Sequence, residues 1–168
     1  QSFINDLYAC RKFETWKLPR RILENKIKYH ADSYDALVKA VITAYASMFN
    51  KNPLFLGDKN NYYVKHLQEL KKIIPESYYI FIVRDPRDVA CSYRDVMRTQ
   101  YKSIYRPSLP YDALEIAQEW KHNTSKIFKH MKLNEERTFL IRYEDLTSNP
   151  PLILKELCRF LGTPYEKA

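Results

Sequence analysis

Glycine is nearly absent from this chain: Gly57 and Gly162 are the only two among 168 residues. A Walker-type phosphate loop and the GxGxxG fingerprint of dinucleotide-binding domains both need several closely spaced glycines, because the backbone must approach the phosphates closely. The sequence therefore excludes both kinds of glycine-rich loop within these residues.

Cysteine is also sparse and unpaired in pattern. Cys10, Cys91 and Cys158 are odd in number and widely spaced, which argues against a disulfide framework and against a structural zinc site. The four histidines show no metal-ligand spacing, so we expect no metal. No apolar run reaches 18 residues, so we expect no membrane span. The missing disulfide pattern favours a cytoplasmic location, although a chain that begins at Gln1 could lack a targeting segment.

Basic residues outnumber acidic ones, and the net charge is +8. This excess favours anionic partners such as nucleotides, nucleic acid, acidic glycans or anionic lipid. Seven of the basic residues and only two acidic ones fall between Arg11 and Lys28. That run is either a solvated helical face or a surface for a polyanion. The length and the 45% hydrophobic content predict one globular domain over residues 1–168, which we expect to continue beyond both ends.

Hydrophobic spacing predicts short strands that alternate with long helices. The expected strands are residues 54–56, 77–83 and 137–142. The expected helices lie on both sides of Pro19 and then at 33–50 (capped by Asp32-Ser33), 62–73, 86–99, 112–132 and 150–161, with a loop or lid at 100–110. This alternation is typical of an α/β fold with a mostly parallel sheet.

The strand at 77–83 ends at Arg84, and Asp85-Pro86 then provides a helix N-cap and a proline at the first helical position. A guanidinium at the carboxyl end of a strand, just before a helix, is a common anion site in α/β proteins. The alternative is an ordinary strand–helix junction with Arg84 in a surface ion pair.

Three segments, in this order, resemble the sulfotransferase superfamily. They are Gly57-Asp58-Lys59, residues 83–93 around Arg84-Asp85-Pro86-Arg87-Asp88, and residues 141–162 from Ile141-Arg142-Tyr143-Glu144-Asp145 to Gly162. The resemblance covers about residues 54–165. It implies a parallel sheet flanked by helices, the P-loop NTPase-like sulfotransferase core, without the N-terminal phosphosulfate-binding loop.

The resemblance also implies a donor and roles for four residues. The donor would be 3′-phosphoadenosine-5′-phosphosulfate, with 3′,5′-adenosine diphosphate as product and no metal. Arg84 and Ser92 would bind the 3′-phosphate, Tyr143 would lie near the adenine, and Lys59 would be the catalytic lysine at the sulfuryl-transfer centre. The acceptor would be a hydroxyl or amine of a small molecule, a glycan or a protein tyrosine, and no nucleic acid partner is expected.

Two departures from the family pattern concern the catalytic base. Asn61 stands where cytosolic members have a histidine, and the loop that precedes the glutamate of other members is absent. Glu14 and His30 are the only nearby substitutes. Two alternatives therefore stay open: a non-catalytic basic domain that binds nucleotide or polyanion, and an RNA- or heparin-type binder that uses residues 11–28. Polyanion binding would weaken steeply with salt.

Overall fold

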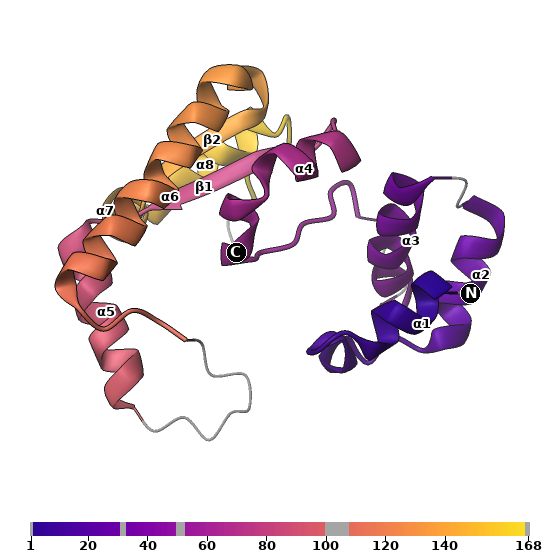
Figure 1. Cartoon of the computed structure of the whole chain (residues 1–168). Helices are drawn as coiled ribbons and strands as arrows, with labels where there is room; N and C mark the ends of the chain where they lie inside the picture. Colours follow the sequence, from indigo (N-terminus) through magenta and orange to yellow (C-terminus); the bar gives the residue numbers. More distant parts are fainter. Residues whose placement is uncertain (1, 31–32, 50–52, 100–107, 167–168) are drawn as a thin grey trace. The chain divides into compact units, whose positions relative to one another are not determined.

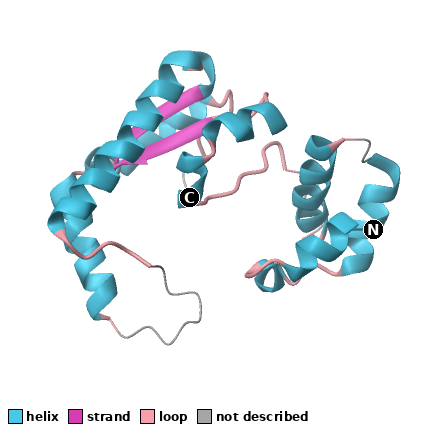
Figure 2. Cartoon of the chain, viewed as in Figure 1, coloured by secondary structure: helices cyan, strands magenta, loops and turns pink. Residues whose placement is uncertain are grey.

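The computed structural model describes residues 2–30, 33–49, 53–99 and 108–166. The chain forms two compact units, residues 1–60 and 61–168 (Figures 1 and 2), and each is described here by itself. The expectation of a single domain over residues 1–168 stays a prediction. Within the described residues, no helix is both long and apolar enough to cross a bilayer.

The first unit is helical. Its elements are α1 (Ser2–Ala9), η1 (Phe13–Trp16), α2 (Arg20–His30) and α3 (Tyr34–Ser47). A small core of Phe13, Leu18, Leu23, Val41 and Ala44 joins them. The Ser33 side chain accepts a hydrogen bond from the backbone N–H of Ala36, so the predicted cap of α3 is confirmed for Ser33, whereas Asp32 and Asn50 lie outside the described residues.

The prediction of a strand at residues 54–56 is wrong. These residues form no strand, and Leu54 is 78% exposed. Their β-propensity reflects a fit to a half-buried pleated surface. Without a neighbouring strand to supply ladder hydrogen bonds, that propensity alone does not produce a strand.

The second unit carries the sheet. Its elements in order are η2 (Asn61–Lys65), α4 (Leu67–Ile73), β1 (Tyr79–Val83), α5 (Pro86–Arg98), α6 (Ala113–Leu133), η3 (Glu135–Arg137), β2 (Thr138–Arg142), α7 (Tyr143–Ser148) and α8 (Pro150–Phe160). The predicted strands at 77–83 and 137–142 and the helices at 86–99, 112–132 and 150–161 are confirmed. The helix that we expected at 62–73 is instead the 3-10 helix η2 followed by α4, with a break at His66, and α7 is an additional short helix. Most of the loop or lid that we expected at 100–110 lies outside the described residues.

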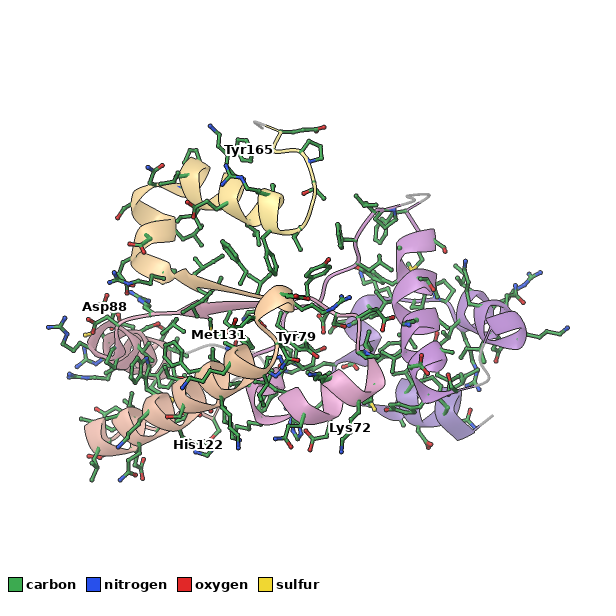
Figure 3. The ribbon with its side chains drawn as sticks, turned by 90° about the horizontal axis from the view of Figure 1, so that it is seen from above. Lys72, Tyr79, Asp88, His122, Met131 and Tyr165 are labelled. Carbon is green, nitrogen blue, oxygen red and sulfur yellow. The ribbon has the colours of Figure 1, made fainter. Side chains whose placement is uncertain are left out.

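Strands β1 and β2 pair in parallel, in register from Tyr79 opposite Thr138 to Val83 opposite Arg142. Helix α6 covers one face of the pair and α8 covers the other (Figures 1 and 3). His130 of α6 contacts the Tyr79 ring at a centroid distance of 4.3 Å, and Phe160 of α8 contacts Phe139 at 5.2 Å. Both strands therefore end at the same edge, which confirms the predicted parallel α/β arrangement.

Candidate anion-binding site

Strand pairing ends at Val83 and Arg142, but the next two positions on each chain are still in contact. Val83 lies opposite Arg142, so the next positions along each chain are Arg84 with Tyr143 and Asp85 with Glu144. Both pairs are in contact. The Arg84 guanidinium carbon lies 4.5 Å from the centroid of the Tyr143 ring, and the Asp85 N–H donates to Glu144 Oε1 at 2.8 Å. Side chains thus replace the ladder hydrogen bonds where the chain enters α5 and α7.

The peptide group between Arg84 and Asp85 is held at both of its polar atoms. Its carbonyl oxygen accepts a hydrogen bond from Trp120 Nε1 of α6 at 2.9 Å, and its N–H is the donor to Glu144. A partly buried indole N–H usually finds a polar partner, and here the partner is the strand end. Helices α6 and α7 therefore fix the backbone from which the Arg84 side chain extends.

Carboxylates already accept hydrogen bonds from backbone N–H groups at the start of α5. The Asp85 side chain accepts from the backbone N–H of Arg87 at 2.8 Å, and from Arg87 Nε and Nη2 at 2.9 and 2.7 Å. These bonds from Arg87 lower the pKa of Asp85 to about 2. The bond from the Asp85 N–H likewise lowers the pKa of Glu144. A bound anion would therefore meet side chains here more readily than the amides of the helix N-terminus that the sequence pattern suggested.

The Arg84 side chain has capacity left for an anion. Its Nε is buried and has no hydrogen-bond partner within the described residues. Nε forms an ion pair with Asp88 Oδ2 at 3.9 Å, so the surface ion pair considered as the alternative is present, but this distance is too long for a hydrogen bond. The side chain is 35% exposed, so solvent and ligands can reach part of it. A partly exposed guanidinium with an unused N–H fits a phosphate group.

Ser92 is half-buried on the same helix, one turn after Asp88 (labelled in Figure 3). Its hydroxyl makes no hydrogen bond to any residue that the structure describes. Of the four predicted site residues, the structure thus brings Arg84 and Tyr143 into contact and places Ser92 on the helix that follows Arg84.

Lys59 belongs to the first unit and lies in a segment without regular secondary structure. It is exposed, and its backbone N–H donates to the Asp58 carboxylate at 2.9 Å. Of the two substitutes considered for the base, Glu14 is exposed on η1, and the side chain of His30 lies outside the described residues.

A surface hollow of about 330 Å³ lies elsewhere in the second unit, lined by Phe128, Met131, Lys132, Glu135 and Thr138. Thr138 begins β2, so this hollow sits at the amino ends of the strands. Ligands of open α/β sheets bind outside the carboxyl ends. The contacts around Arg84, and not this hollow, therefore define the candidate site.

Trp120 and Glu144 are the two residues of the site that the sequence reading missed. Trp120 lies on the apolar stripe of the expected helix at 112–132, and that spacing predicts burial but names no partner for its indole N–H. Glu144 was included only as part of the family pattern. Its pairing with Asp85 follows from the parallel register, which the sequence does not specify.

Comparisons with known proteins show which family the chain resembles as a whole. A family model described as "Sulfotransferase family" matches residues 7–167. A solved structure, the "Sulfotransferase Domain from the Curacin Biosynthetic Pathway", is similar with a TM-score of 0.60 and 26% identity over 79% of this chain and 45% of that chain. This chain therefore spans less than half the length of that structure. No curated protein matches the chain.

The family model covers nearly all of the sequence, and two of the segments that carried the resemblance are in contact through Arg84 and Tyr143. The chain belongs to the sulfotransferase family.

Proposed function

We propose that this chain binds 3′-phosphoadenosine-5′-phosphosulfate and takes part in transferring its sulfuryl group to a hydroxyl or amine. In this transfer the acceptor oxygen or nitrogen forms a bond to sulfur, the bond from sulfur to the 5′-phosphate oxygen breaks, and 3′,5′-adenosine diphosphate leaves. A base takes the acceptor proton.

One observation carries the proposal: Arg84 extends from the carboxyl end of β1 with a guanidinium that is partly exposed and has no hydrogen-bond partner among the described residues at Nε. We assign Arg84 to the 3′-phosphate, because a guanidinium provides charge and directed N–H donors together. Ser92 adds a hydroxyl donor to the same phosphate, and Tyr143 lies near the adenine. The three residues bind and orient the donor.

Lys59 is assigned to the transfer itself. Negative charge builds up on the bridging oxygen as the bond to sulfur breaks, and a fixed ammonium there stabilises the transition state. Its role differs from that of Arg84, since it acts on the charge that appears during the reaction and not on the resting phosphate.

Calorimetry with 3′,5′-adenosine diphosphate tests the donor site. A charge-assisted hydrogen bond contributes about 1.5–3 kcal/mol, so Arg84→Ala should weaken binding by about 10- to 100-fold. Arg137→Ala is a matched control, because Arg137 also lies over a tyrosine ring, Tyr78, at a distance of 5.4 Å. Equal affinity in wild type and Arg84→Ala would refute the assignment.

A further inference from the structure

We propose that Trp120, Tyr143 and Glu144 are positioning residues that fix Arg84 in the orientation needed to recognise a 3′-phosphate. What Arg84 binds rests on the proposed function. That these three residues hold Arg84 in place rests on contacts within the chain.

The backbone part of the arrangement depends on Trp120 and Glu144. They bind the carbonyl oxygen and the N–H of one peptide group, at 2.9 and 2.8 Å, and they come from different helices. Rotation of this peptide would break both bonds together. The direction in which the Arg84 side chain leaves the strand is therefore set before any ligand arrives.

The side-chain part depends on Tyr143. A guanidinium carbon 4.5 Å from the ring centroid is well within the range of a cation–π contact. The ring restricts the long Arg84 side chain, which would otherwise lose conformational entropy when it binds a ligand. Ordering a group before binding improves affinity, because the entropic cost falls on folding and not on association.

The same arrangement explains why a hydrogen-bond donor stays unused. Arg84 lies on a ring face and 3.9 Å from Asp88, so neither contact satisfies its buried Nε–H. A buried donor without an acceptor is costly. Tyr143 and the doubly held peptide keep Arg84 in this state, and a phosphate oxygen would bind the exposed part of the guanidinium.

The test compares the affinities of each protein for 3′,5′-adenosine diphosphate and for 5′-adenosine monophosphate. We define the ratio as the affinity for 3′,5′-adenosine diphosphate divided by the affinity for 5′-adenosine monophosphate. This ratio reports the contribution of the 3′-phosphate alone, and a general loss of stability does not change it. Tyr143→Leu and Glu144→Ala should lower this ratio about threefold to tenfold. Tyr143→Phe keeps the ring, Glu144→Gln keeps an acceptor oxygen, and both should preserve the ratio. Trp120→Phe, which loses the indole N–H, should lower it.

Tyr78→Leu is the matched control, because Tyr78 is 40% exposed against 37% for Tyr143 and its ring also contacts an arginine, Arg137. The proposal is overturned if Tyr143→Leu keeps the ratio, if Tyr78→Leu lowers it equally, or if Tyr143→Phe lowers it as much as Tyr143→Leu.

A second measurement separates this proposal from the proposed function. If wild type shows no preference for the 3′-phosphorylated nucleotide, the assignment of Arg84 to that phosphate fails. The Arg84 Nε–H resonance then decides the positioning role. A ring-current shift in wild type that disappears in Tyr143→Leu supports it, and an unchanged resonance refutes it.

Discussion

Trp120 and Glu144 bind opposite atoms of one peptide group, the carbonyl oxygen of Arg84 and the N–H of Asp85. Trp120 lies in the middle of α6, and Glu144 is the second residue of α7. The end of β1 is therefore fixed by parts of the chain 36 and 59 residues away in sequence. The contacts that define this strand end are tertiary and not local.

Ser92→Ala should weaken the binding of 3′,5′-adenosine diphosphate less than Arg84→Ala does. A neutral hydroxyl bond is worth about 1 kcal/mol, against about 1.5–3 kcal/mol for a charge-assisted one. Calorimetry on the two single variants and the double variant gives the coupling between them. Strictly additive losses would indicate that the two side chains do not share a phosphate.

Lys59→Ala should separate binding from turnover. The ammonium is assigned to charge that develops in the transition state, so product affinity should change by less than about twofold while kcat falls by about 100-fold or more. Single-turnover assays on the full protein measure the rate. A large loss of product affinity would instead place Lys59 in the resting nucleotide site.

Asp85→Asn should reduce the loss of stability at acid pH. The pKa of Asp85 is about 2 in the folded chain, and an unfolded aspartate titrates at about 4. Between these values only the unfolded chain binds the proton, so stability that is present above about pH 4 is lost as the pH falls through this window. Asparagine caps a helix equally well but does not titrate there. Urea midpoints measured from pH 5 to 3 should therefore fall less in the variant, and parallel curves would contradict this.

His130→Leu should remove a different pH dependence, near neutrality. His130 is 6% exposed, and its imidazole ring packs against the rings of Tyr79 and Phe81. Its Nε2 has no hydrogen-bond partner among the described residues. Burial, and then the positive charge of Lys71, lower the pKa of His130. As the pH falls below about 6.5, the unfolded chain binds the proton first, so the folded state loses stability.

Unfolding midpoints at pH 7.5 and 5.5 measure this effect. The difference between them should be smaller in His130→Leu than in wild type. His122→Leu, on the exposed side of the same helix, is the control and should leave the difference unchanged. If both variants behave alike, His130 does not account for the loss.

Local signals in the sequence predicted most of the second unit. The strand 77–83 with Asp85-Pro86 placed Arg84 correctly at the junction of β1 and α5, because an N-cap and a proline at the first helical position act within a few residues. The same local signals misassigned residues 54–56, since a strand also needs a partner that lies elsewhere in the chain.

The site itself was only half predictable. Arg84 follows from the end of a recognisable strand, and Tyr143 from the resemblance to the sulfotransferase superfamily. Their contact, and the bond between Asp85 and Glu144, depend on the register of β1 against β2, which hydrophobic patterns leave open by two residues at a time. The hydrogen bond from Trp120 to Arg84 could not be predicted, because many positions on α6 would bury an indole equally well.

The hydrogen bond from Trp120 to Arg84 also gives the second unit an intrinsic optical reporter. The chain has two tryptophans, and Trp16 lies in the first unit. In a Trp16→Phe protein, all tryptophan fluorescence of this chain would come from Trp120. The Trp120 ring is hydrogen-bonded to Arg84, the residue that we assign to the phosphate. Ligand binding at that end of the sheet can then be followed by fluorescence, without a label and without turnover.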